Sequence, residues 1–310
     1  MPTAATPGTE TQFDAESPVQ MRLPPFRVHR PRSVQEASRL LDELGDEAAA
    51  YCGGTELLLA MKLGLADYSH LVDLKRVDGL RGIATQHDSL RIGASATHYE
   101  LESSPVLRAW CPAMTIMSSQ VANLRVRSAG TLGGNLCFAD PHSDPATFLV
   151  AVGASILCQK EDDTRRIPAA DFVTGPYQTL LEPGELLVAV ELPALPEGTG
   201  VAHVRMKLRE RPAVTVAAMV RLTRGAISQA RLVVGSVGAV PVAADAAESM
   251  LGAGAADFGA RADACAEQAS LACSPLPDGD CSPDYLRHLV VVHSRQALTA
   301  AFAAVRSEGS

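Results

Sequence analysis

AAAYCGGTELLLAMKLG, residues 48–64, places a pair of glycines between two apolar runs. The run before the glycines predicts a short buried strand, and the leucine-rich run after them predicts a helix. Glycine carries no Cβ, so Gly53 and Gly54 can adopt positive φ and let another group approach the backbone closely. The first N–H groups of a helix have no partner within the helix and attract anions. The stretch therefore predicts an anion-binding turn at the carboxyl end of a strand.

The residues that precede this stretch predict a strand and a helix. FRVHRP, residues 26–31, is typical of a short strand. SVQEASRLLDELG, residues 33–45, predicts a helix with Ser33 as its cap, Glu36 as the capping-box partner and Gly45 as its end. Residues 26–52 thus predict a strand–helix–strand unit with a right-handed crossover.

A second glycine-rich segment, Gly130–Asn135, lies within RVRSAGTLGGNLCFADPHSDP, residues 125–145. From the residues alone, the two segments predict either a nest of backbone N–H groups for phosphate oxygens or tight turns with ordinary packing roles, and both readings stay open. Thr55, Ser128 and Thr131 add hydroxyl donors. Asn135 adds an amide that both donates and accepts, and Asp144 adds a carboxylate that suits a sugar hydroxyl. A Rossmann dinucleotide site is disfavoured because GxGxxG is absent.

The remaining patterns predict alternating strands and helices in two parts. Strands are predicted at residues 70–77, 89–95, 154–160 and 185–193, and Thr97 with Glu100 predicts a second capping box that opens helical pieces up to Leu124. PALPEGTG, residues 193–200, predicts a domain boundary near residue 198. Beyond it, residues 202–208, 214–222 and 230–237 predict three antiparallel strands, and helices are predicted at residues 243–251, 257–272 and 284–305.

Composition excludes several classes of function. The 310 residues are 47% hydrophobic, which suffices for sizeable cores, and the net charge of −8 argues against nucleic-acid binding. No apolar run approaches the ~18 residues of a membrane span, so no membrane insertion is expected. Residues 1–22, rich in Thr, Pro, Ala and Glu, predict a disordered tail without the apolar segment of a signal peptide. We therefore expect a cytoplasmic protein.

Catalytic and metal-binding motifs are absent from the sequence. HExxH, GxSxG, the P-loop and paired-cysteine patterns do not occur, so no catalytic residue and no metal ligand is predicted. His288 and His293 are five residues apart, which does not place them on one helix face, and structural roles are expected. The cysteines are expected to be free thiols, and the eight-residue spacing of Cys265, Cys273 and Cys281 matches no metal site. The chain is equipped to hold a ligand rather than to attack one.

Long stretches of the chain carry the motifs of one family. AYCGGTELLLAMKLG, residues 50–64, has the form AGGTDLLxxMK, and SAGTLGGNLCFADPHSD, residues 128–144, has the form RNxATIGGNLxxAxPxxD. These stretches and IPAADFVTGPYQTLLEPGELLVAVELP, residues 167–193, resemble the FAD-binding medium subunits of the molybdenum hydroxylases, the xanthine dehydrogenase and carbon monoxide dehydrogenase group. LVVGSVGAVPVAADAAESMLG, residues 232–252, and SPDYLRHLVVVHSRQALTAAF, residues 282–302, resemble the C-terminal domain of that family. The resemblance runs from about residue 23 to residue 304.

The resemblance implies an α+β fold of two domains. Residues 23–198 would form a PCMH-type FAD-binding domain of two subdomains, about 23–95 and 96–198. Residues 199–305 would form a small domain like the CO dehydrogenase flavoprotein C-terminal domain, with a three-stranded antiparallel sheet and helices.

The resemblance also implies a non-covalent FAD site between the two subdomains. The pyrophosphate would lie against Ala50, Tyr51, Cys52, Gly53, Gly54, Thr55, Glu56 and Leu57. The opposite side would be formed by Thr131, Leu132, Gly133, Gly134, Asn135 and Asp144, with Asp144 on the ribityl or sugar hydroxyls. Val121 and Leu187 would pack near the cofactor, and Lys207 would lie close to the flavin.

The implied function is that of an electron-transfer subunit in a hetero-oligomeric complex. A molybdopterin-binding large subunit would oxidise the substrate, and a small subunit with [2Fe-2S] clusters would relay electrons to FAD on this chain for delivery to an external acceptor. The runner-up is a stand-alone PCMH-type flavin oxidase or dehydrogenase, for which Cys52 is the nearest candidate for covalent attachment. A cofactor-free scaffold is the third possibility, which the two intact glycine motifs disfavour. The substrate, the acceptor and the stoichiometry stay open.

Three departures from the family pattern bear on these expectations. Ser128 replaces the usual Asn and keeps its hydrogen-bonding capacity, whereas Ala213 and Val214 stand where an Asp often follows the Lys/Arg cluster. That second departure leaves the electron acceptor open. The four-cysteine insertion of the hydroxybenzoyl-CoA reductases is absent, which disfavours that branch.

Overall fold

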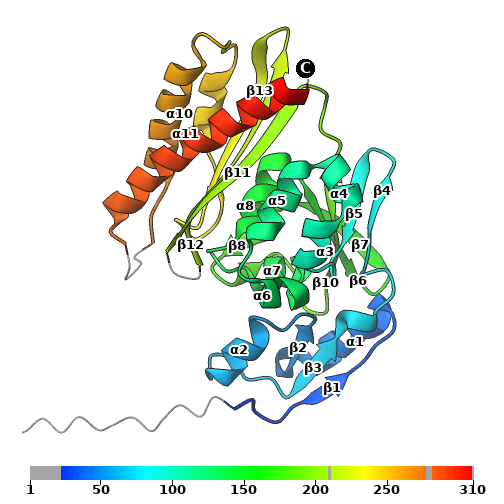
Figure 1. Cartoon of the computed structure of the whole chain (residues 1–310). Helices are drawn as coiled ribbons and strands as arrows, with labels where there is room; N and C mark the ends of the chain where they lie inside the picture. The colour runs from blue at the N-terminus through cyan, green and yellow to red at the C-terminus, as the bar shows by residue number, and fades with distance from the viewer. Residues whose placement is uncertain (1–21, 209–210, 277–280, 309–310) are drawn as a thin grey trace, which may run out of the picture.

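The computed structural model describes residues 22–208, 211–276 and 281–308. The chain builds three layers in sequence order, which Figure 1 shows from the blue N-terminal layer through the green middle unit to the yellow and red C-terminal domain. The predicted tail over residues 1–22 lies outside the described residues except for Arg22.

The first layer is a parallel sheet with the strand order β1-β3-β2. Its strands are β1 (Arg27–His29), β2 (Ala48–Tyr51) and β3 (His70–Asp73), and its helices are α1 (Val34–Leu44) and α2 (Leu57–Lys62). Ser33 caps α1 by accepting a hydrogen bond from the Glu36 N–H, as predicted, whereas the Glu36 carboxylate accepts from the Arg32 N–H. The glycine pair follows the end of β2 and precedes α2.

The middle unit is an antiparallel sheet with the strand order β4-β5-β10-β6-β7. Its strands are β4 (Ile83–Gln86), β5 (Ser89–Gly93), β6 (Ser155–Lys160), β7 (Asp163–Pro168) and β10 (Leu186–Pro193). Because β5 pairs with β10, the β4–β5 hairpin belongs to this second sheet, although the predicted division at residue 95 assigns it to the first subdomain.

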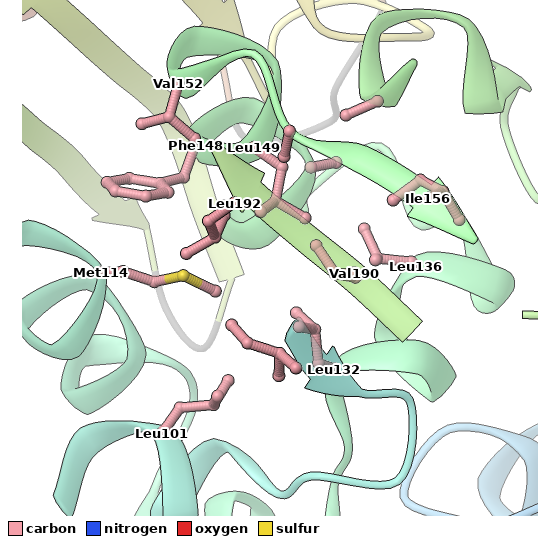
Figure 2. Packing of buried hydrophobic residues seen from close by; sticks show 14 of the residues in the cluster. Leu101, Met114, Leu132, Leu136, Phe148, Leu149, Val152, Ile156, Val190 and Leu192 are labelled. Atoms are coloured by element: carbon pink, nitrogen blue, oxygen red, sulfur yellow. The ribbon is translucent and has the colours of Figure 1, made fainter. Parts of the chain in front are cut away.

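Short helices link β5 to β6 and cover the sheet of the middle unit. They are α3 (His98–Ser103), α4 (Pro105–Trp110), α5 (Pro112–Gln120), α6 (Leu124–Ala129), α7 (Leu132–Phe138) and α8 (Asp144–Val152), and α9 (Ala169–Phe172) with the two-stranded sheet β8 (Val173–Gly175) and β9 (Gln178–Thr179) follows β7. The helical region is in pieces, as predicted, because Pro105 and Pro112 each begin a new helix. Leu132, Phe148 and Val190 meet in the core between these helices and the sheet (Figure 2).

The C-terminal domain is a four-stranded antiparallel sheet with two helices on one face. Its elements are β11 (Thr199–Leu208), β12 (Arg211–Thr223), β13 (Ala226–Gly235), β14 (Val242–Ala243), α10 (Phe258–Ala272) and α11 (Pro283–Glu308). The prediction of three strands is wrong, because Val242 and Ala243 pair with the end of β13. The helix predicted at residues 243–251 is a short 3-10 helix, Asp245–Met250.

The middle unit packs directly on the C-terminal sheet. Helix α8 lies against β12 and β13, on the face opposite α10 and α11 (Figure 1). Ala151 of α8 is fully buried against Ala217 and Val233. In the described part of the chain, no helix combines the length and apolarity that a membrane span requires.

Candidate functional site

A cavity of about 440 Å³ lies where the first layer, the middle unit and the C-terminal domain meet. Most of the predicted site residues line it. They are Ala50, Cys52, Gly53, Gly54, Thr55, Glu56, Leu57, Val121, Thr131, Gly133, Gly134, Asn135, Asp144 and Leu187. The structure therefore brings both glycine segments and Asp144 to one cavity.

Three predicted residues lie outside the lining of this cavity. The Tyr51 ring lies under the Lys75 ammonium, with 3.8 Å between the nitrogen and the ring centroid. Leu132 is fully buried in the core, and Lys207 is exposed on β11. The charge of Lys207 still reaches the site, because it lowers the pKa of the Asp144 carboxyl.

The first glycine turn presents unused backbone donors. Within the described chain, the N–H groups of Gly53, Gly54, Thr55 and Glu56 make no hydrogen bond to a backbone or side-chain acceptor. Gly54 has a φ of +68°, which makes the turn possible before α2. These four amides are consecutive and border the cavity, an arrangement that suits an anion.

Gly53 has no room for a side chain, because the backbone of another segment lies directly against it. A Cβ on Gly53 would lie 2.2 Å from the carbonyl oxygen of Ala129 and 2.9 Å from the Cα of Gly130. The first glycine turn thus packs directly against the backbone of the second glycine segment. The absence of a side chain at Gly53 therefore lets the first layer pack closely against the middle unit.

The second glycine segment does not form the predicted nest of free amides. The N–H groups of Leu132 and Gly133 donate to the carbonyls of Ala96 and Ala94, and those of Gly134 and Asn135 donate to Thr131. Gly133 is required by packing, because its Cβ would lie 2.8 Å from the Ala94 Cβ. The expectation of a phosphate nest is therefore wrong for this segment, which caps α7 and packs it on residues 94–96, directly after β5.

The predicted polar side chains differ in what they can offer a ligand. The Thr131 hydroxyl caps α7, and the Asn135 amide oxygen accepts a hydrogen bond of 2.7 Å from Ser143 Oγ. The Ser128 hydroxyl donates to the Leu124 carbonyl at 2.8 Å and does not line the cavity. Ser128 is therefore not a ligand donor here, because an exposed helical hydroxyl satisfies its own helix.

Asp144 begins α8 and is buried, with 4% of its surface exposed. Its Oδ2 accepts a hydrogen bond of 2.6 Å from Arg205 Nη1, while its Oδ1 has no hydrogen-bond partner among the described residues. Burial raises the pKa of the Asp144 carboxyl to about 6, against the lowering effects of Arg205 and Lys207. At neutral pH the site thus holds a buried carboxylate with one unused acceptor.

Other residues of the site were missed at the sequence level. Arg205 of β11 and Arg211 of β12 line the cavity, and Arg211 forms ion pairs with Glu56 and Asp140. The available signal was the alternation in HVRMK, residues 203–207, where polar side chains share one face of a strand. His98 also lines the cavity as a buried residue, and burial lowers its pKa to about 4, so its imidazole is neutral at pH 7.

The Cys52 thiol in the lining is a poor nucleophile. Burial raises the pKa of this thiol. The reactive thiolate form is therefore scarce at neutral pH. Among the described residues, no cluster of three or more His, Cys, Asp and Glu side chains could hold a metal ion.

The donor set fits a phosphorylated ligand that also carries hydroxyl groups. Four free amides lie on one side of the cavity, and a buried carboxylate oxygen without a partner lies on another. Free N–H groups bind phosphate oxygens, and a carboxylate accepts from a hydroxyl. The arrangement can bind and orient such a ligand, and its residues supply no activated nucleophile.

Two family matches cover nearly the whole chain. Residues 24–195 match the FAD binding domain in molybdopterin dehydrogenase, and residues 204–301 match the CO dehydrogenase flavoprotein C-terminal domain. The first match alone covers more than half of the chain.

Similar proteins extend over the same length. The carbon monoxide dehydrogenase medium chain of Hydrogenophaga pseudoflava is 33% identical over 91% of this chain and 99% of its own. The putative xanthine dehydrogenase FAD-binding subunit of Escherichia coli K12 is 28% identical over 89% of this chain and 96% of its own. The structure superposes on carbon monoxide dehydrogenase from H. pseudoflava with a TM-score of 0.88 at 33% identity, covering 91% of this chain and 99% of that one. It superposes on quinoline 2-oxidoreductase from Pseudomonas putida 86 with a TM-score of 0.85 at 28% identity, covering 92% and 99%.

Proposed function

We infer the function of this chain from a plain premise: it belongs to the FAD-binding medium subunits of the molybdenum hydroxylases, the family of the carbon monoxide and xanthine dehydrogenases. The chain is an FAD-carrying electron-transfer subunit of a molybdenum hydroxylase complex. The single observation that carries the proposal is that one cavity is lined both by four consecutive free amides and by a buried carboxylate.

The cavity residues divide into groups that suit different parts of FAD. The free N–H groups of Gly53, Gly54, Thr55 and Glu56 would hold the pyrophosphate. Asp144 would accept from a hydroxyl of the ribityl chain or a sugar. Apolar lining side chains, among them Val121 and Leu187, would exclude water beside the ring system.

When bound, FAD supplies the capacity to collect single electrons from iron–sulfur clusters and to deliver two to an external acceptor. This chain's task is then to bind, orient and tune the cofactor. A site without an activated nucleophile suits that task. The raised pKa of the Cys52 thiol supports non-covalent binding.

The proposed partners are a molybdopterin-binding large subunit and a small subunit with [2Fe-2S] clusters. The relatives are medium chains and subunits by name, which supports a hetero-oligomer. The proposed location is the cytoplasm, because Cys52, Cys111, Cys137, Cys158, Cys265 and Cys273 are free thiols, as expected in a reducing compartment.

Isolation of the native complex tests the proposal. We expect co-purifying chains that contain molybdopterin and [2Fe-2S] clusters, and acid precipitation should release yellow FAD into the supernatant. Flavin retained in the precipitated chain would indicate covalent attachment. Recovery of this chain only as an active monomer would refute the subunit function and favour the stand-alone oxidase.

A further inference from the structure

We propose that Arg205 is a positioning residue of the cofactor site: it holds the Asp144 carboxylate ionised and turned so that one oxygen is kept for a ligand hydroxyl. The inference rests on the proposed binding of FAD and goes beyond it by assigning a task to a residue of the C-terminal domain. The site in the FAD-binding domain would then be complete only when β11 is docked.

The hydrogen bonds of Arg205 fix its guanidinium between two elements of the middle unit. Nη1 donates to the Gln120 carbonyl at the end of α5 at 2.5 Å and to Asp144 Oδ2 at the start of α8 at 2.6 Å. The side chains of Arg205 and Asp144 are 7% and 4% exposed. A charge-assisted hydrogen bond in such a dry setting is strong and directional.

The unused hydrogen-bonding capacity of this pair points to a ligand. Asp144 Oδ1 and Arg205 Nε are both buried, and neither has a hydrogen-bond partner in the described chain. Buried polar atoms in native proteins are almost always paired, so an unpaired acceptor beside an unpaired donor calls for an explanation. Both residues line the cavity, so a bound molecule is the simplest explanation for the two unpaired atoms.

The other groups around Asp144 cannot replace Arg205. His203 Nε2 lies 3.6 Å from Asp144 Oδ1, but burial lowers the pKa of this imidazole to about 3, so it carries no charge at neutral pH. Lys207 acts on Asp144 only through its charge, from an exposed position. Arg205 is therefore the cation in direct contact, and it opposes the effect of burial on the carboxyl.

The pH dependence of FAD binding tests this role in the full-length chain after removal of its flavin. The dissociation constant for FAD is measured by fluorescence titration from about pH 5 to pH 8 for the wild type, Arg205→Met, Arg205→Lys and Asp144→Asn. An ionised Asp144 binds a hydroxyl more strongly than a protonated one. Wild-type affinity should therefore fall as the pH drops through about 6, the pKa of this carboxyl.

In Arg205→Met the midpoint of this fall should move up by about one pH unit or more, since loss of an adjacent cation raises a carboxyl pKa. In Arg205→Lys the midpoint should return most of the way to the wild-type value, because the lysine supplies a positive charge. Asp144→Asn should abolish the pH dependence. Arg231→Met is the matched control, because Arg231 lies against Gly153 at the far end of α8 and outside the cavity lining.

Two failures are distinguishable. Absence of FAD binding by the wild type at every pH would refute the proposed function. Wild-type binding with an unmoved midpoint in Arg205→Met, even at lower affinity, would refute the positioning role, because a merely structural contact weakens binding equally at each pH.

Discussion

At the scale of single residues, the glycines of the site are needed for close packing as much as for ligand binding. Gly53 faces the Ala129 carbonyl, so a side chain there would push the first layer away from the middle unit, and Gly133 faces Ala94, so a side chain there would push α7 away from the segment that follows β5. Gly54 alone among these three has a positive φ. The free amides of the first turn thus depend on a close backbone contact that a sequence pattern cannot display.

Replacement of Gly53 by alanine tests this contact. The new methyl would require the backbone at Ala129 to shift, so we expect a loss of about 1–3 kcal/mol in the free energy of unfolding and weaker FAD binding. Denaturant unfolding measures the first effect and fluorescence titration the second. Gly259→Ala is the control, since its Cβ meets nothing within 4 Å, and it should stabilise α10 by about 0.5–1 kcal/mol. An unchanged midpoint for Gly53→Ala would contradict the packing explanation.

The buried His98 makes the free energy of unfolding depend on pH. Its pKa is lowered by burial from 6.5 to about 4. Between these values the unfolded chain binds a proton that the folded chain does not, so stability is lost as the pH falls from 6.5 towards 4, by up to about 1.4 kcal/mol per pH unit.

His98→Leu should remove this contribution. We expect a shallower decline of stability between about pH 6.5 and pH 5 than in the wild type, measured by urea unfolding at several pH values. Asp144 titrates with the opposite sign in this range, because its folded pKa is raised, and it is common to both proteins. Parallel curves for the two proteins would show that His98 is protonated in the folded state.

At the scale of elements, local signals predicted most of the fold. Capping residues located α1 and α3, and the region after Thr97 was predicted as helical pieces, which the structure divides at Pro105 and Pro112. Errors arose where pairing with another strand decided the outcome. Val242 and Ala243 form a strand only because β13 offers its edge, and β5 joins β10, almost a hundred residues later.

The capping box of α3 should carry measurable stability. Thr97 Oγ1 accepts from the Glu100 N–H at 3.1 Å, and Glu100 Oε2 accepts from the Thr97 N–H at 2.8 Å. Thr97→Ala should cost about 1 kcal/mol, observed as a lower thermal midpoint. Thr85→Ala on the exposed strand β4 is the control and should have a much smaller effect. Equal effects of the two substitutions would show that the box does not stabilise α3.

At the scale of the whole molecule, the sequence predicted which segments gather at the site but not how the C-terminal domain completes it. The glycine motifs and Asp144 were found because they form local patterns. Arg205 and Arg211 were missed, because their role depends on β11 and β12 being docked beside α5, α8 and Asp140. Long-range packing of this kind has no local signature.

Arg211 connects the three parts of the molecule and supports a last prediction. From β12 it pairs with Glu56, next to the first glycine turn, and with Asp140, which follows α7. Arg211 is 47% exposed, so these pairs contribute little, about 0.2–1 kcal/mol, and salt weakens them. Arg211→Gln should leave global stability nearly unchanged and should loosen the first layer where Glu56 precedes α2.

Hydrogen exchange of the α2 amides, Leu57–Lys62, measures this loosening. We expect about 1.4- to fivefold faster exchange in Arg211→Gln than in the wild type, because a loss of about 0.2–1 kcal/mol changes an opening equilibrium by that ratio. High salt should speed exchange in the wild type and have little effect in the variant, which separates lost ion pairing from lost packing. Arg91→Gln, which removes a half-buried arginine hydrogen-bonded to the Gly79 carbonyl, is the matched control. Equal α2 exchange in all three proteins would mean that contacts other than Arg211 hold the first layer at the cavity.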